Sequence, residues 1–559
     1  MLTSPLRRLS SLIFLAFAYF ALAACGGSSG SNGGGNPPDR PDPPDTNPTS
    51  FTFAAAEGVE PGAKAVSETI TIEGIDANVS LAVTVDGGQY RLNEGQFQSG
   101  ASNAGLGDEL TLQGTAPETP EETQTVTVTV GEHTATFDVV AAGDTGAPEA
   151  AFVFPPPITA TEGDTVIVRG TAEDEWSEVD RVTLTVNHEG GTNDYEVDTE
   201  DDFATWQKQV TLGPGENTIT LQAEDALGNK VSEEERQSVT VVQQAFAEAF
   251  PDDEVAIEKP QSLIFDEERD RILVTDFSAN RIVSVDLATG SRSVFLQLDD
   301  EEREVGVGRP SGLVLDAPRN RLLVNGDTVE GGSVLGVDLD TKEVTLINSR
   351  ETPNEDQPAF STPRGMAVDP SDPEQVFVLA SGTNNLARLN LATGLRTLVS
   401  SNDIPESGPG FDYPSQLAVG SGGARALVGQ ASPDGIMSVD LDTGDREVFL
   451  TEGEPEGTPE LMVRAIVNSD LEELVLVQNI INQELWAVDK DSRSITLISG
   501  GEHPHGHNPL GWFIDMELAP NEEFVAGITS RSNRIDALYA IDPVTGERLV
   551  ISKPTGDIE

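Results

Sequence analysis

Cysteine is nearly absent from this sequence, which has one cysteine, Cys25, among 559 residues. A redox cysteine pair is therefore excluded. Basic residues are also scarce: 33 lysines and arginines stand against 95 acidic residues, and five histidines are present, for a formal net charge of −62. Because a chain this acidic repels polyanions, we exclude nucleic acid as a partner.

Long apolar runs are scarce as well, and the run near the N-terminus is short. Leu12 to Ala24 is apolar and follows Arg7 and Arg8, which is the layout of a secretory signal. The run has fewer residues than the roughly 20 that a membrane-spanning helix needs. The sequence also has no Walker or H-E-x-x-H motif, so neither motif indicates a reaction.

The signal ends in Leu22-Ala-Ala-Cys25-Gly26, which resembles a bacterial lipobox. The resemblance implies that residues 1–25 end at a lipidated Cys25 and that acyl chains anchor the exported protein to a membrane. Sorting in that family implies the outer membrane, because Gly26 and not Asp follows the cysteine; the leaflet stays open. The alternative is an ordinary cleavage site with an incidental thiol, although a lone free cysteine is unusual in an exported protein.

Residues 26–50 contain Gly, Ser, Pro and Asp in a run with no apolar pattern. Such a segment cannot form a core, so we expect a disordered tether. A flexible coil of this length has an r.m.s. span of roughly 25 to 30 Å. The segment is predicted to hold the folded body away from the membrane.

Two modules with period-two alternation follow, at residues 51–143 and 144–243. Runs such as Thr125-Val-Thr-Val-Thr-Val130 predict an antiparallel β-sandwich. Gly88 to Phe97, with the pattern G-x-Y-x-L-N-x-G-x-F, resembles a bacterial immunoglobulin-like module. Gly170-Thr-Ala172-Glu-Asp174 and Ala223 to Asn229 resemble a second bacterial Ig-like domain.

Three acids of the second module are candidate calcium ligands. Asp174, Asp180 and Asp225 lie near predicted turns, and hard cations take clusters of carboxylates. The alternative is that they are turn and surface acids. The pattern does not decide between the two.

Residues 244–559 contain six copies of a unit of about fifty residues. Each copy has a strand that ends in an acid or amide, and successive end points are separated by 52, 52, 50, 49 and 53 residues: Asp286, Asp338, Asn390, Asp440, Asp489 and Asp542. Four short β-rich runs per copy predict a four-stranded sheet. Because one such sheet cannot bury both faces, we expect six to close into a propeller, with an array of sandwiches as the alternative.

These copies resemble NHL-type six-bladed propeller repeats. The resemblance rests on the P-x-G-apolar-D opening, as in Pro310 to Asp316, and on the turn Asp440-Leu-Asp-Thr-Gly444. It implies the propeller fold and leaves function open, since many functions use this scaffold. The fold class predicted for the whole chain is all-β: two Ig-like sandwiches and a six-bladed propeller.

Long connections between successive copies indicate the binding face. In a propeller they gather beside the central channel. We expect Arg364, Trp512 and Asp515 to contact a ligand there, whereas Trp206 and Trp486 lie in apolar strand patterns that predict core packing.

Two metal sites are considered on that face. Glu258-Lys-Pro260 is similar to the opening E-G-P of gluconolactonase-like metal hydrolases, which implies Glu258 as a metal ligand. The later positions that hold Asn in that family are here Ser311, Arg364 and Ser415, so the implied site is incomplete.

The second candidate is a loop with alternating histidines, His503, His505 and His507. Neutral imidazoles suit zinc or copper, so this loop is a candidate metal site; a plain polar loop is the alternative. A divalent metal (Ca, Zn or Cu) is therefore the one cofactor considered.

The sequence predicts a monomeric lipoprotein of the cell envelope whose propeller binds a protein or glycan partner. A metal-dependent hydrolase or lyase acting at the same face is the alternative.

Overall fold

The computed structural model describes residues 43–198, 203–244, 255–298, 308–328, 331–349, 357–358, 360–405, 408–420, 422–431, 434–453, 456, 458–469, 473–504, 507–529 and 537–552. The predicted signal, Cys25 and most of the tether lie outside these residues. The described part is built from β-strands and three single 3-10 turns, which confirms the all-β prediction. Among these residues, no helix has the length and hydropathy of a membrane span. The chain divides into two compact units, residues 1–142 and 143–559.

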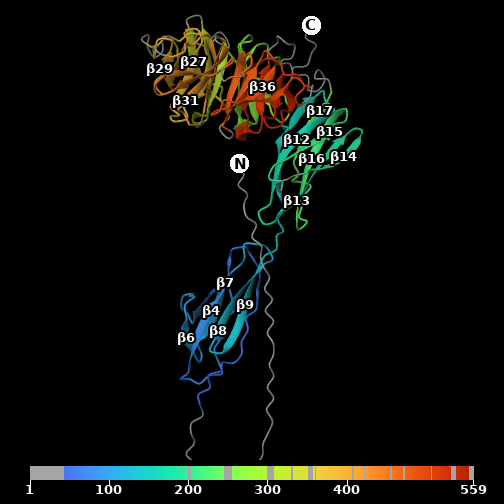
Figure 1. The fold of residues 1–559 in the computed structure, drawn as a ribbon, viewed down its shortest axis with the longest axis vertical. Coiled ribbons are helices and arrows are strands. Elements are labelled where there is room, and N and C mark those ends of the chain that lie inside the picture. Colours follow the sequence, from blue (N-terminus) through green and yellow to red (C-terminus); the bar gives the residue numbers. More distant parts are fainter. Residues whose placement is uncertain are drawn as a thin grey trace, which may run out of the picture. The chain divides into compact units, whose positions relative to one another are not determined.

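The first unit is a pair of facing sheets. One has the strand order β1-β9-β8-β4-β6, and the other is β2-β7-β3 with β5 also paired to β7. Alternation explains the core: Val126, Val128 and Val130 of β8 point inward while the threonines between them are more exposed. Figure 1 shows β4, β8 and β9 side by side. The strands are β1 (Ala56–Val59), β2 (Lys64–Val66), β3 (Ile70–Thr71), β4 (Ser80–Asp86), β5 (Gln89–Leu92), β6 (Ser102–Gly105), β7 (Glu109–Thr115), β8 (Thr123–Val130) and β9 (His133–Ala141).

The second unit begins with another sandwich. Its smaller sheet is β10-β12-β15, and the facing sheet contains β14-β13-β16-β17-β11. Leu184, Trp206 and Ile219 are buried between the two sheets. The strands are β10 (Glu149–Phe154), β11 (Ile158–Thr161), β12 (Thr165–Glu173), β13 (Val179–His188), β14 (Gly191–Glu196), β15 (Trp206–Thr211), β16 (Gly215–Asp225) and β17 (Ser238–Gln243).

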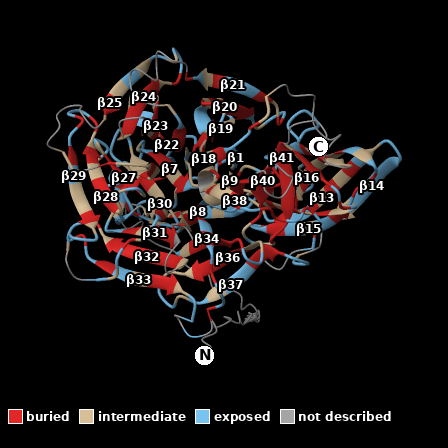
Figure 2. Ribbon diagram, turned by 90° about the horizontal axis from the view of Figure 1, so that it is seen from above, coloured by how far each residue is buried: buried red, intermediate tan, exposed pale blue. Residues whose placement is uncertain are grey.

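The rest of the second unit, residues 260–552, is a ring of sheets (Figure 2). Its described strands form six groups of four consecutive antiparallel strands, five as separate sheets and the last within a larger sheet. The first strand of each group contacts that of the next, and β38 contacts β18, so the inner strands close on themselves. In group order the strands are β18 (Pro260–Asp266), β19 (Arg271–Asp276), β20 (Arg281–Asp286) and β21 (Arg292–Gln297); β22 (Pro310–Asp316), β23 (Arg321–Thr328), β24 (Gly331–Asp338) and β25 (Val344–Asn348); β26 (Pro363–Val368), β27 (Gln375–Ala380), β28 (Asn385–Asn390) and β29 (Arg396–Ser401); β30 (Pro414–Val419), β31 (Arg425–Ala431), β32 (Asp434–Asp440) and β33 (Arg446–Thr451); β34 (Val463–Ser469), β35 (Leu474–Asn479), β36 (Glu484–Asp489) and β37 (Ile495–Gly500); β38 (Phe513–Leu518), β39 (Val525–Thr529), β40 (Leu538–Ile541) and β41 (Arg548–Ser552). The 3-10 turns are η2 (Glu267–Arg269), η3 (Ala317–Arg319) and η4 (Pro520–Glu522).

The sandwich and the ring share one nine-stranded sheet. Strand β11 pairs in parallel with β17 and antiparallel with β41, where Ala160 lies opposite Val550. A buried ion pair joins the same two parts: Arg169 Nε lies 2.8 Å from a carboxylate oxygen of Asp542. The expected boundary at residues 243/244 therefore does not separate two compact units.

The last group of the ring has an additional neighbouring strand, β11, which comes from the second sandwich. Gln244 follows β17 without joining a strand, and residues 245–250 lie outside the described residues. In the described structure, β11 occupies the edge of β41. This edge of the ring is thereby covered and is paired at Ala160 and Val550.

Four of the seams between neighbouring groups carry a buried arginine. Each arginine begins the outermost strand of its group and donates to a Ser or Asn near the end of the preceding outermost strand. The pairs are Arg292–Ser552, Arg396–Asn348, Arg446–Ser400 and Arg548–Ser499. Their remaining described hydrogen bonds go mainly to loop carbonyls, and burial lowers the pKa of Arg396 to about 10. The Arg292–Ser552 pair joins the first group to the last.

The other two seams are apolar at the same positions. Val344 and Ile495 replace the arginine, and Leu296 and Leu450 replace its Ser or Asn partner. Leu296 lies in one apolar cluster with Val344, and Leu450 lies in another with Ile495. Both members of the pair are apolar at these two seams, so neither leaves a buried side-chain donor or acceptor without a partner there.

Candidate functional site

A cavity of about 890 Å³ lies along the axis of the ring. All six inner strands contribute to its wall, and its lining mixes apolar side chains such as Leu417 and Met366 with polar ones. The first strands of the six groups form this wall because they contact one another around the axis of the ring. A volume of this size matches the pockets that hold small molecules or short chain segments.

Two arginines from non-adjacent groups line this cavity. Arg364 on β26 and Arg464 on β34 occupy equivalent positions, one residue after the first residue of their strands. Burial lowers the pKa of Arg364, the charge of Asp327 opposes this effect, and the positive charge of Arg464 adds to it. The two guanidinium groups are thus close enough to repel each other.

Arg364 is held in place by an amide. Its Nη1 donates to Oε1 of Gln261 on β18, at 3.0 Å, and Nε2 of Gln261 donates to the Pro260 carbonyl, at 2.7 Å. Neither Arg364 nor Arg464 forms an ion pair with any residue that the structure describes. Both keep donors that an added anion would accept from.

Two carboxyl groups lie deeper on strand β38. Burial raises the pKa of Asp515 to about 6. Burial, and then the charge of Asp515, raise the pKa of Glu517 to about 8. Asp515 accepts a hydrogen bond from the backbone N–H of Leu263, at 3.1 Å, across the closing seam of the ring. At neutral pH Glu517 therefore carries a proton and can donate a hydrogen bond into the cavity.

Two exposed aromatic rings also contribute to the lining. Trp512 precedes β38 and is 37% exposed, and Tyr413 precedes β30 and is 68% exposed. The backbone N–H of Tyr413 donates to Oδ1 of Asn384, at 3.2 Å. Exposed indole and phenol rings offer flat apolar faces to a ligand.

The structure brings together three residues predicted from the sequence: Arg364, Trp512 and Asp515 all line the cavity. Whether they bind a ligand stays a prediction. Glu258 is exposed and is not part of the lining, whereas Ser311 and Ser415 are. The wall thus has serine and arginine at the positions where the gluconolactonase-like hydrolases hold asparagine.

The histidine loop lies elsewhere in the ring. His503 and His507 have exposed side chains, and their carbonyls accept hydrogen bonds from Arg548, at 2.7 and 2.8 Å; His505 lies outside the described residues. The His507 ring lies against Gly163 of the second sandwich. The described part of this loop is fixed through its backbone, and its role in metal binding stays a prediction.

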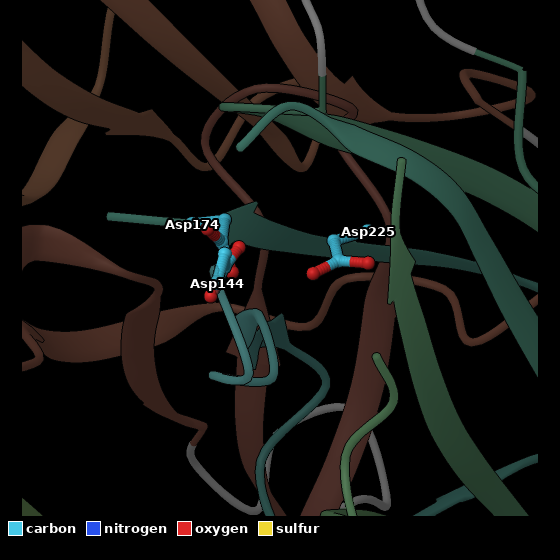
Figure 3. Close-up of side chains that lie close together, drawn as sticks. All are labelled: Asp144, Asp174 and Asp225. Atoms are coloured by element: carbon cyan, nitrogen blue, oxygen red, sulfur yellow. The ribbon is translucent and has the colours of Figure 1, made fainter. Parts of the chain in front are cut away.

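A carboxylate cluster lies in the second sandwich. Oxygens of Asp144, Asp174 and Asp225 all lie within 4.8 Å of one another (Figure 3), and Asp180 is not in this group. Burial opposes ionisation of Asp225, but hydrogen bonds from Asn229, Leu227 and Ser177 outweigh it and lower the pKa. Among the described residues, this is the one group of three or more acids or histidines with metal-ligand spacing. The donor set is all oxygen and would suit a calcium ion.

Several residues of these sites were missed. Arg464 was detectable, because the repeat places it where Arg364 stands in the third group. Glu517 follows Asp515 by two residues, so strand alternation places both side chains on the same face. Asp144 had no such signal: it precedes the sandwich strands, and its carbonyl accepts a hydrogen bond from Asn229, 85 residues further along the chain.

The core packing predicted for Trp206 and Trp486 is confirmed, since each is 4% exposed.

The fold and the cavity together define an all-β protein with a propeller-like ring. The profile of a family described as glucodextranase, domain B, matches residues 148–244. That range is the second sandwich alone, so the likeness concerns this module. Among curated proteins, none matches the sequence.

Solved structures give weak likenesses over larger parts of the chain. An auxiliary nutrient binding protein from Bacteroides thetaiotaomicron is 10% identical, with 72% of this chain and 96% of that chain covered and a TM-score of 0.39. A calcium-binding protein, regucalcin, from Agrobacterium tumefaciens is 14% identical, with 55% and 96% covered and a TM-score of 0.37. The Cps50 (Swd1) β-propeller domain from Myceliophteria thermophila is 13% identical, with 55% and 89% covered and a TM-score of 0.35. At TM-scores below 0.5, none of these likenesses supports an argument about function.

Proposed function

We propose that this chain is an exported lipoprotein, anchored through Cys25, whose C-terminal ring is a six-bladed propeller that binds a protein or glycan partner at the cell envelope. The two sandwiches are Ig-like spacers, and residues 26–50 are the tether. The outer membrane is the proposed location, because Gly26 follows the cysteine, and the protein acts as a monomer.

The axial cavity is the observation that carries this proposal. Its wall combines two arginines, two exposed aromatic rings and scattered apolar side chains, which is the composition of a binding pocket. A cavity of about 890 Å³ fits a short extended group, such as the end of a glycan, better than a folded domain.

A metal-dependent hydrolase or lyase is the alternative. That chemistry needs several oxygen or nitrogen ligands around one point. The described ring residues bring no third acid or histidine to metal-ligand distance of Asp515 and Glu517. Glu258, the metal ligand implied by resemblance, lies outside the cavity wall. The wall therefore supports recognition better than metal-assisted turnover.

Filling the cavity tests the proposal. The detergent-solubilised full chain is applied to an array of neutral and acidic oligosaccharides and, separately, is cross-linked in intact envelopes. We expect Ser415→Trp, which places an indole in the cavity wall, to abolish captured partners. The control is Ser293→Trp, an exposed position on the outermost strand β21. Equal capture by wild type and Ser415→Trp would refute the cavity as the binding site.

The anchor has its own test. Changing Cys25 to Ser removes the thiol that acylation requires, so we expect the protein to move from the membrane fraction to the soluble fraction. Fractionation followed by immunoblotting measures this change. Retention of Cys25→Ser in the membrane fraction would contradict lipid anchoring at this residue.

A further inference from the structure

The positive charge in the cavity wall is unusual for this protein. Acids outnumber lysines and arginines by 95 to 33. Most described arginines of the ring are already engaged in ion pairs or in buried hydrogen bonds; examples are Arg281 with Asp276, Arg321 with Asp316 and Arg446 with Ser400. Arg464, by contrast, has no hydrogen-bond, ion-pair or ring partner within the described residues, and it is exposed inside the cavity.

The acids near these two arginines do not neutralise them fully. Asp327 interacts with Arg364 and Asp434 with Arg464 through charge, but neither carboxylate lies within ion-pair distance in the described structure. Burial raises the pKa of both Asp327 and Asp434, and the neighbouring arginine opposes this rise. The cavity thus has two like charges that repel each other and retain free donors. An anion between the two guanidinium groups would relieve the repulsion and accept charge-assisted hydrogen bonds.

The other residues of the cavity wall indicate which kind of molecule bears the anionic group. The rings of Trp512 and Tyr413 offer stacking faces, and the protonated carboxyl of Glu517 offers a hydrogen bond deeper in the cavity. A ligand that combines flat apolar ring faces with many hydroxyl groups uses both features, and sugars have this combination.

We propose that the cavity binds an anionic saccharide, with the carboxylate or sulfate of one sugar held between Arg364 and Arg464 and the sugar ring against Trp512. This inference rests on the proposed binding function and specifies its ligand. Gln261 is a positioning residue, because its hydrogen bond holds Arg364 toward the cavity.

The net charge of −62 does not prevent this binding. At physiological ionic strength the Debye length is about 8 Å, so most of the acids, spread over 559 residues, are screened from the cavity. Within the wall itself, Lys259, Arg364 and Arg464 stand against Asp434 and Asp515, while Glu517 is protonated, so the local charge is positive. Arginine also presents paired N–H donors that match the oxygens of carboxylates and sulfates.

Titration calorimetry on the detergent-solubilised full chain tests the ligand class. The probes are trigalacturonate, a sulfated trisaccharide of neutral sugars, and maltotriose, at neutral pH and 0.15 M salt. The carboxylate and sulfate probes distinguish the two sources of negative charge, and maltotriose supplies the neutral reference. We expect at least one anionic probe to bind more tightly than maltotriose by on the order of 10-fold or more.

Variants assign the effect to the cavity. Arg464→Gln should lower the affinity for the preferred anionic probe on the order of 10-fold. Arg464→Lys should retain part of the affinity because it keeps the charge. Since the Arg464 side chain forms no hydrogen bond or ion pair within the described residues, neither change removes such a contact. Arg425→Gln is the matched control: this arginine lies on β31, outside the cavity wall, and its loss should leave affinity unchanged.

The outcomes separate this inference from the proposed function. If maltotriose binds as well as the anionic probes, and Ser415→Trp abolishes its binding, the cavity is a binding site and the anionic ligand class is wrong. Anionic binding that Arg464→Gln leaves unchanged would also overturn the inference. If wild type binds none of the probes, the anionic saccharide is refuted, and the cross-linking experiment with Ser415→Trp then decides the proposed function by itself.

Discussion

The two sandwiches of this protein have similar sequence patterns but different structural roles. The first sandwich closes its own core, with Val83, Val128 and Phe137 in a cluster that contains no residue beyond 141. The core of the second sandwich continues into the ring, so that Val168 belongs to the same cluster as Leu538 and Leu549. Alternating strands therefore specify a sandwich, but an unpaired edge and the neighbouring side chains decide whether it stays separate. We expect the first sandwich to unfold independently and the second to unfold with the ring.

The strongest test of this difference is to remove the buried ion pair between the second sandwich and the ring. Arg169→Ala leaves the fully buried Asp542 carboxylate without its charged partner, which should lower the free energy of unfolding of the second unit by about 3 to 5 kcal/mol. Calorimetry should show a lower melting temperature for the transition of the second unit alone.

Arg181→Ala is the matched control for that experiment. Its ion pair with Glu224 lies at the surface of the same sandwich, so no measurable change is expected. A loss with Arg169→Ala no larger than that with Arg181→Ala would show that this contact does not couple the two parts.

The first sandwich should respond to its own core. Leu112→Ala removes a fully buried side chain and should destabilise the first unit by about 2 to 5 kcal/mol. In a urea titration we expect one transition to move and the other to keep its midpoint. Movement of both transitions together would mean that the two units unfold cooperatively.

Exchanging one kind of seam within the ring for the other should cause a smaller loss of stability. Arg446→Ile should destabilise the second unit by about 2 kcal/mol, because Ser400 and loop carbonyls lose their donor. Adding Ser400→Leu copies the apolar Leu450–Ile495 seam and should recover part of this loss. A double-mutant cycle from urea denaturation measures the coupling, and we expect about 1 kcal/mol of favourable interaction. Strictly additive losses would indicate that the two seam types are not exchangeable.

The smallest expected effect depends on pH. The pKa of Glu517 is about 8 in the folded protein, against an ordinary pKa of 4.5 for a glutamate side chain. Below pH 4.5 both states hold the proton; as pH rises from 4.5 to 8 the unfolded state loses it first, so the stability of the folded state falls. Glu517→Gln should therefore stabilise the second unit by about 2 kcal/mol at pH 8, given the partial access of water, and should have little effect at pH 4.

Melting curves at the two pH values check this expectation in the transition of the second unit. The first unit contains no part of the cavity wall, so its transition should be the same in both proteins. An equal gain at pH 4 and pH 8 would rule out the titration of Glu517 as the cause.

Local sequence patterns were sufficient to predict the strands and the repeat. Alternating Val and Thr predicted β8, and the opening at Pro310 predicted the first residue of β22. These features depend on side chains a few residues apart, which a sequence displays directly.

The missed features depend on residues far apart in the sequence. Strand β11 has four residues after a run of prolines, and nothing local indicates that Ala160 lies opposite Val550. Arg464 was overlooked because the fifth repeat lacks the opening proline that draws attention to Arg364. Asp144 joins Asp174 and Asp225 only through tertiary contacts.

The most direct test of the binding site is a crystal structure of the full chain with trigalacturonate or the sulfated trisaccharide. We predict the anionic group of the sugar within hydrogen-bond distance of the guanidinium groups of both Arg364 and Arg464, and a sugar ring against Trp512. A saccharide bound on either sandwich or on the outside of the ring, with the axial cavity empty, would contradict this account.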